Sequence, residues 1–281
     1  MAQLHISTPD GGQAVHSEEQ VRDLWEQGSL ADSTLCWKKG MTNWQPLREY
    51  LSAAADEPPV AAPAAPARFS FVKDPTGLTS FLVTMLWLSL GIEVIMLLSN
   101  LAQLQLATTV PIPVAAAKVN DTRQQIIAIV FLCTFIVTGI TFLKWIYRAN
   151  LNSRGFGAPN MEFTSGWAVG WYFVPFANLI MPFKVMKEIW QVSGNPQHWK
   201  GEPGSPLLGW WWGLWLTSNF LGQLSSALSK HIKDAESLKT ATITLIIAAI
   251  VGIPRCWVAL KLVMTIHRRQ QAIVEQGPSL S

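Results

Sequence analysis

Long apolar segments dominate the pattern of hydrophobic and polar positions in the second part of the chain. Four of them cover about residues 79–101, 125–147, 207–228 and 241–265. Each has roughly 20 or more residues, which is the length that a helix needs to cross a bilayer. We therefore predict an all-α, polytopic membrane bundle with four transmembrane helices.

A fifth apolar segment, residues 164–183, is long enough to cross but contains Pro175 and Pro182, with Asn178 between them. Trp167 and Trp171 lie in its first half. Proline removes a backbone donor, and irregular backbone at membrane depth needs protein or water around it. We predict a broken element here, either re-entrant or interfacial, in which the Asn178 side chain could satisfy freed carbonyls.

The distribution of basic residues bears on whether this fifth segment crosses. Leaving out the soluble module and the mid-span Arg255, five spans place eight basic residues on each side of the membrane, whereas four spans place eleven inside and five outside. The positive-inside rule favours the second arrangement. We therefore predict a multi-pass protein of a bacterial inner membrane, with both termini in the cytoplasm.

The first part of the chain has a different pattern, with short periodic segments and no long apolar run. Ser17 is a predicted N-cap with Gln20 as its capping-box partner, and Gly28 is the predicted end of that helix. Two strand candidates follow, STLCW and WQPL, joined by a turn that contains Gly40. These features predict a small α+β module over residues 1–55.

Composition and charge support a division of the chain into a soluble and a membrane part. Hydrophobic residues make up 49% of the chain and charged residues 14%. Residues 1–76 carry six basic and ten acidic side chains, a net charge of −4, whereas the remainder has a net charge of +7. We expect a Pro/Ala-rich linker over 56–76, a membrane domain over 77–271 and a flexible tail over 272–281, and no signal peptide.

Glu93 and Arg255 are ionisable residues deep within predicted spans, where an unpaired charge is costly. They could form a structural ion pair, or Arg255 could snorkel from a shorter span. Alternatively, together with Asn178 they could line a proton or ion pathway, or Arg255 could hold an anionic lipid headgroup. Nothing in the spacing decides among these.

Small and aromatic residues also mark the membrane domain. Two Gly-x-x-x-Gly pairs, Gly166 with Gly170 and Gly209 with Gly213, predict close helix packing within the chain, or alternatively between subunits. A run of tryptophans opens the third span, and we interpret it as an interface belt: Trp210, Trp211, Trp212 and Trp215.

The segment SEEQVRDLWEQGSLADSTLCWKKGMTNWQPL resembles the bacterial variant of the GYF domain. The resemblance implies an adaptor fold that binds proline-rich peptides through aromatic side chains. Trp25, Trp37 and Trp44 are the candidates for such a surface, although tryptophans in so small a domain more often form its core. The Pro/Ala-rich linker is a spacer, or itself a ligand for such a groove.

The region from about residue 77 to 271 resembles a bacterial integral-membrane family of unknown function. The likeness rests on FLKWIYRANLN, GWAVGWYFVPFANLIMPFKVMKEIW and GWWWGLWLTSN. It implies an architecture without an activity.

The chain lacks the sequence signatures of a catalytic, metal or phosphate-binding site, so we expect neither an enzyme nor a cofactor. Our first hypothesis is a membrane-anchored adaptor whose module binds a cytoplasmic protein or proline-rich peptide. The second is a small transporter, channel or lipid-handling protein that uses the broken element and Arg255. The expected partners are the lipid bilayer and that peptide or protein, with a homo-oligomer as a further option and no nucleic acid.

Overall fold

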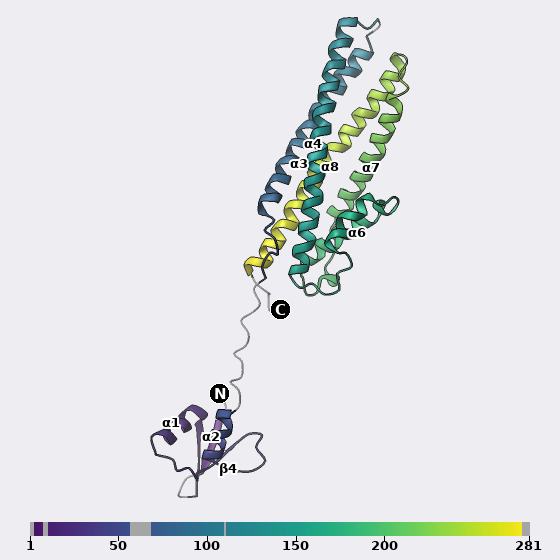
Figure 1. Cartoon of the computed structure of the whole chain (residues 1–281). Helices are drawn as coiled ribbons and strands as arrows, with labels where there is room; N and C mark the ends of the chain where they lie inside the picture. The colour runs from purple at the N-terminus through teal and green to yellow at the C-terminus, as the bar shows by residue number, and fades with distance from the viewer. Residues whose placement is uncertain (1–2, 8–10, 57–68, 110, 277–281) are drawn as a thin grey trace. The chain divides into compact units, whose positions relative to one another are not determined.

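The computed structural model describes residues 3–7, 11–56, 69–109 and 111–276 (Figure 1). The chain divides into two compact units, residues 1–65 and 66–281. The expected Pro/Ala-rich linker falls mainly outside the described residues.

The first unit is a small α+β domain, as predicted, built on a four-stranded antiparallel sheet in the order β2-β1-β3-β4. The strands are β1 (Gln3–Ser7), β2 (Gln13–Ser17), β3 (Leu35–Lys38) and β4 (Gln45–Pro46), with α1 (Glu18–Glu26) and α2 (Leu47–Asp56) as the helices. Sequence reasoning located α1, β3 and β4. It missed β1, β2 and α2.

Local signals explain where α1 begins and ends. The Ser17 hydroxyl accepts a hydrogen bond from the Gln20 amide at 3.3 Å, and the Gln20 side chain accepts one from the Ser17 amide at 3.0 Å. This reciprocal pair is the predicted capping box. After the helix, Gly28 has φ +73°, a conformation that glycine adopts without a steric penalty. The face of α1 that carries Val21 is thereby fixed against the sheet.

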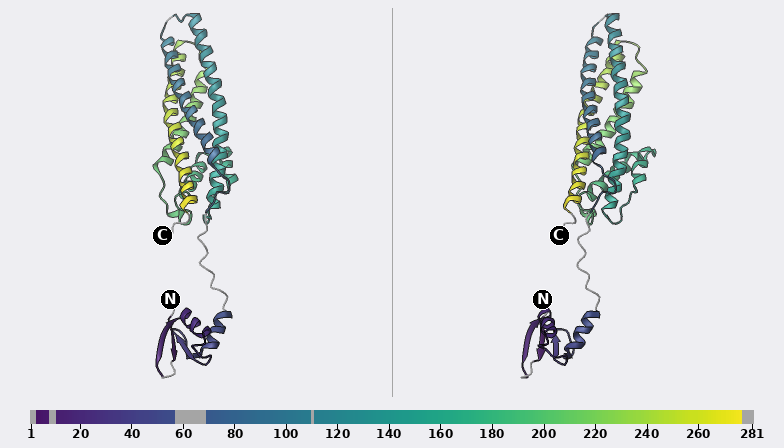
Figure 2. Two further views of the ribbon diagram at one scale, coloured as in Figure 1. Left: turned by 90° about the vertical axis from the view of Figure 1, so that its left-hand side faces the viewer. Right: turned by 60° about the vertical axis from the view of Figure 1, so that its left-hand side comes forward.

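The second unit contains four long helices: α3 (Thr76–Ala107), α4 (Val114–Gly155), α7 (Pro206–Ser229) and α8 (Ala235–Gln276). Helix α8 packs along both α3 and α7, and α4 packs along α3 (Figures 1 and 2). Among the described residues, α4 and α7 have no comparable contact along their lengths. Helix α8 continues through Gln276, past the residue at which we expected the domain to end.

Three of these helices are long and apolar enough to cross a membrane: Thr76–Ala107, Val114–Gly155 and the described part of α8. They point to a multi-pass membrane protein. Helix α7 coincides with the predicted span over residues 207–228, but it is not one of these three helices.

The segment predicted to be broken does not form one helix. It consists of α5 (Ser165–Gly170), η1 (Trp171–Phe173) and η2 (Ala177–Leu179), followed by α6 (Met181–Val192). Pro175 lies between η1 and η2, and Pro182 lies in the first turn of α6. Phe176 has φ +64°, which is uncommon for a residue with a side chain. The short helix η3 (Trp199–Gly201) precedes α7.

Helix α6 is amphipathic. Val185, Met186 and Ile189 are fully buried against the bundle, and Trp190 is nearly so. Glu188 is buried as well. Two backbone amides of the loop before α5 donate to its carboxylate and compensate for the burial.

Candidate functional site

The three candidate tryptophans of the first unit are half-buried and none belongs to the fully buried core. That core is made of Leu4, Ile6, Val21, Cys36, Leu47, Tyr50 and Leu51. Trp25 packs against the core from α1, and its indole nitrogen donates to Asp32 at 2.9 Å. The expectation that the tryptophans form the core therefore holds in part, and for Trp25 alone.

Trp37 lies on the face of the sheet that points away from the core. Side chains alternate along a strand, so the burial of Leu4 and Cys36 places His5 and Trp37 on the opposite face. Strand register sets Val15, His5 and Trp37 side by side on three neighbouring strands. The His5 and Trp37 rings meet edge to face at 5.5 Å.

Leu35 shares this face with Trp37, two residues along β3. Leu35 and Val15 are both exposed, at 41% and 48%. We call the surface formed by His5, Val15, Leu35 and Trp37 the outer sheet face. Trp25 lies on the other side of the sheet, so the structure does not gather the candidate tryptophans on a single face.

In the membrane domain, Glu93 and Arg255 form an ion pair between α3 and α8. The Arg255 Nη2 atom donates to the Glu93 Oε1 atom at 2.7 Å, and the two side chains are 20% and 6% exposed. The structure therefore shows the ion pair, which was one of the alternatives considered from the sequence. Gly252 makes room for it, because a Cβ atom at that position would overlap the Glu93 carboxylate.

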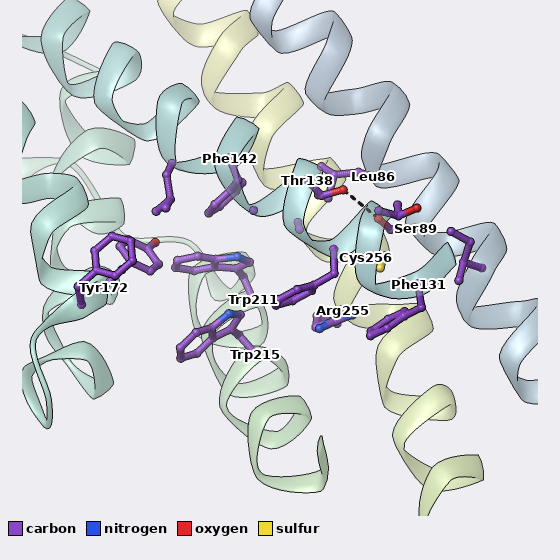
Figure 3. Close-up of a pocket in the computed structure, with 17 residues that line it drawn as sticks. Leu86, Ser89, Phe131, Thr138, Phe142, Tyr172, Trp211, Trp215, Arg255 and Cys256 are labelled. Atoms are coloured by element: carbon purple, nitrogen blue, oxygen red, sulfur yellow. Dashed lines mark hydrogen bonds between the residues drawn. The ribbon is translucent and has the colours of Figure 1, made fainter. Parts of the chain in front are cut away.

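A cavity of about 350 Å³ lies beside this pair (Figure 3). Its walls come from α3, α4, α7 and α8, with Tyr172 and Phe173 of η1 at one end. Aromatic rings make up much of the lining: Phe131, Phe135, Phe142, Trp211 and Trp215. The cavity lies between α4 and α7, which have no extensive contact along their lengths among the described residues.

The polar groups of the cavity are few. Arg255 is the charged residue in the lining, and the hydroxyls come from Ser89, Thr134, Thr138 and Tyr172. Ser89 and Thr138 share a hydrogen bond of 3.3 Å between α3 and α4. A mostly apolar pocket with a few fixed polar groups is the usual form of a small-molecule site.

Asn178 does not join Glu93 and Arg255, contrary to the three-residue site considered from the sequence. It lies on η2, outside the cavity lining, and no hydrogen bond links it to either residue. Backbone amides and one indole bond the carbonyls of the broken backbone. The Ala177 amide donates to the Pro175 carbonyl at 2.7 Å, the Asn178 amide to the Val174 carbonyl at 2.9 Å, and the Trp212 indole to the Leu179 carbonyl at 2.9 Å.

The tryptophan run of α7 is only partly an interface belt. Trp211 and Trp212 are buried in the bundle, whereas Trp210 is 66% exposed. Trp167 is also exposed and contacts Trp171, with ring centroids 4.8 Å apart. The belt interpretation is therefore wrong for Trp211 and Trp212, which pack inside.

The two Gly-x-x-x-Gly pairs do not mediate helix packing within the chain. Added Cβ atoms at Gly166, Gly209 and Gly213 would meet nothing within 4 Å. At Gly170 the nearest atoms belong to Trp167, in the same short helix. The prediction of close intramolecular packing at these glycines is wrong.

Sequence reasoning missed a polar clamp where α4 ends. The Phe163 carbonyl accepts bonds from Arg154, at 2.8 Å from Nη2, and from Asn150 at 3.3 Å. Glu188 accepts from the Glu162 and Phe163 amides at 2.6 and 3.3 Å. Burial raises the pKa of Glu188, while these two backbone donors oppose the rise. The clamp positions the loop that leads into the broken segment.

No curated protein and no solved structure gave a significant match to this chain. Two families did match. The family described as GYF domain 2 matches residues 16–50, which include α1, β3 and β4. The family described as domain of unknown function DUF4328 matches residues 108–268, more than half of the chain, beginning after α3. The chain therefore belongs to the DUF4328 family, and it carries a GYF domain 2 in front of that region.

Proposed function

We propose that this protein is a non-enzymatic, membrane-anchored adaptor whose GYF-type module binds a protein or peptide at the outer sheet face. The observation that carries the proposal is the exposure of Val15 and Leu35 beside the half-buried Trp37, on a sheet whose core is already filled. Exposed apolar side chains grouped on one face are typical of a binding surface.

The chemistry of this face suits a proline-rich segment. Such segments adopt an extended polyproline II helix and dock on aromatic surfaces at a low entropic cost. Trp37 offers an indole with its ring nitrogen already bonded to the Met41 carbonyl at 2.9 Å, which fixes the ring. A fixed ring loses little freedom when a peptide binds.

Purified full-length protein tests this proposal. The probe is a synthetic peptide with the sequence of residues 56–67, DEPPVAAPAAPA. The control peptide has the same sequence with each proline replaced by alanine. We expect Trp37→Ala to abolish binding of the first peptide. Arg22→Ala, an exposed change on α1, is the matched control. Capture experiments with a peptide library extend the test, and equal capture by the wild type and Trp37→Ala would contradict the proposal.

For the membrane domain we propose four spans, α3, α4, α7 and α8, with both termini in the cytoplasm of a bacterial cell. Basic residues are in excess on the side of the membrane where α4 ends and α7 begins, and this excess supports the orientation. Helix α6 lies against the start of α7, so the broken segment would enter and leave by the cytoplasmic face (Figure 1).

Labelling from either side of the membrane tests the topology. Gln197 and Lys233 are exposed residues at opposite ends of α7. We expect a cysteine at position 197 to react only from the cytoplasmic side and one at position 233 only from the outside. The reverse pattern would support five spans instead.

A second candidate function is the handling of a small apolar molecule by the membrane domain. The cavity beside Arg255 is the observation that favours it, because its volume and lining suit a ligand. Binding of a labelled lipid-like probe that is lost on filling the cavity would support this role.

A further inference from the structure

We propose that the cavity between α4 and α7 binds a neutral lipid whose carbonyl oxygen accepts hydrogen bonds from Arg255, and that it discriminates against anionic lipids. This inference rests on the proposed ligand-binding role of the cavity and adds the chemical class of the ligand.

The first step of the argument is the charge of the site. Arg255 is held by Glu93 at 2.7 Å, so the guanidinium charge is balanced inside the protein. A carboxylate or phosphate entering beside Arg255 would also approach the Glu93 carboxylate. Like charges repel strongly where water is scarce, so an anion gains little from this arginine.

The second step is the number of donors that remain. A guanidinium group has five N–H donors and no acceptor. Within the part of the chain that the structure describes, the Arg255 side chain donates from Nη2 to Glu93 and also interacts with the Cys256 side chain, so these two partners do not use all five donors. The arginine also contributes to the cavity lining. An oxygen that accepts without carrying a charge therefore complements this wall of the cavity.

The third step is the shape of the apolar part. Figure 3 shows Trp211 and Trp215 between Tyr172 and Arg255, so the rings extend away from the arginine along the cavity. Phe142 meets Trp211 with ring centroids 6.1 Å apart and contributes a further ring to the cavity wall. A head at Arg255 with an apolar chain or ring along the tryptophans fits this layout.

Three probes of equal chain length test the inference on detergent-purified full-length protein. They are 2-dodecanone, which has a neutral carbonyl, dodecanoate, which is anionic, and dodecane, which has no acceptor. Equilibrium binding of the radiolabelled probes is measured for each. We expect 2-dodecanone to bind at least about tenfold more tightly than either of the others, the discrimination that one good hydrogen bond to a charged group supplies.

Variants locate the binding. Gly139 lines the cavity and a Cβ atom there meets nothing within 4 Å, so Gly139→Leu is chosen to place an apolar side chain at the cavity wall. We expect this change to weaken binding of 2-dodecanone at least tenfold. The control is Ile140→Leu, which alters the neighbouring exposed side chain. Thr134→Phe narrows the same cavity and serves as an independent second variant.

A separate variant tests the proposal that the site discriminates against an anionic head group. Glu93→Gln removes the charge that balances Arg255, so we expect dodecanoate binding to rise relative to 2-dodecanone. Equal binding of dodecane and 2-dodecanone, or preference of the wild type for dodecanoate, would overturn this inference and leave the cavity as a ligand site. If no probe shows binding that Gly139→Leu and Thr134→Phe reduce, the inference and the ligand-handling role both fail.

Discussion

Glu93 on α3 and Gly252 on α8 face each other so closely that the carboxylate of the first fills the space of a side chain on the second. This contact ties the two helices with the most extensive mutual packing in the bundle. We expect Gly252→Ala to displace the carboxylate and weaken its bond to Arg255.

The cost of Gly252→Ala is about 1–3 kcal/mol for overpacking, and more if the ion pair breaks. Thermal unfolding of the purified protein in detergent measures it. Gly91→Ala on α3, where an added Cβ atom meets nothing within 4 Å, is the control and should leave the unfolding temperature unchanged or slightly raised. Equal effects of the two substitutions would contradict the close contact.

Removing one member of the ion pair should lower the free energy of unfolding more than removing both. Arg255→Met leaves a buried carboxylate without a partner and should cost about 3–5 kcal/mol. In the double variant Glu93→Leu with Arg255→Met, apolar side chains replace both charges, and we expect most of the stability to return. A double-mutant cycle on unfolding free energies gives the coupling. Additive losses would show that the two side chains do not depend on each other.

The buried Glu188 makes stability depend on pH. Its pKa lies above the ordinary value of 4.5, chiefly because burial disfavours the charged form. A carboxyl group with a raised pKa in the folded state contributes stability that is complete below the unfolded pKa and is lost as pH rises through the folded pKa. We expect the wild type to lose part of its stability on going upward from about pH 4.5, and Glu188→Gln to lose less.

Unfolding temperatures measured across this pH range distinguish the two proteins. Glu236→Gln removes an exposed carboxyl group and should keep the wild-type profile. A wild-type profile that coincides with that of Glu188→Gln would mean that this group titrates as it does in the unfolded chain.

Trp212 stabilises the broken segment through a single hydrogen bond. Trp212→Phe keeps most of the ring but removes the donor that bonds the Leu179 carbonyl. An unsatisfied carbonyl in apolar surroundings costs about 1–3 kcal/mol. We expect faster amide hydrogen exchange at residues 177–181, with Trp210→Phe, a change in an exposed tryptophan, as the control. Unchanged exchange would indicate that another group bonds this carbonyl.

Features encoded within a few residues could be predicted from the sequence. The capping box of Ser17 and Gln20 and the stop at Gly28 follow from contacts three to four residues apart, and all are confirmed. The break at Pro175 is local as well. The pairing of Glu93 with Arg255 was one of several alternatives, and it needed only the depth of each residue along its helix.

Features that depend on which helices pack together could not be predicted. The pattern of α6 placed Glu188 among polar residues, because the amides of Glu162 and Phe163 that compensate its burial come from a loop about 25 residues away. The open surroundings of Gly209 and Gly213 have the same origin, since a glycine pair does not reveal its neighbour. The strands β1 and β2 are short, and each is stabilised mainly by its partner.

The position of the cavity between α4 and α7 has a consequence for how any solute would arrive. In the proposed four-span arrangement, a mouth on the flank of the helix bundle faces the hydrocarbon phase, so molecules dissolved in the bilayer reach it by lateral diffusion in two dimensions. Occupancy then follows the concentration of the solute in the lipid and not in water. Strongly partitioning compounds would therefore fill the cavity even at a modest intrinsic affinity.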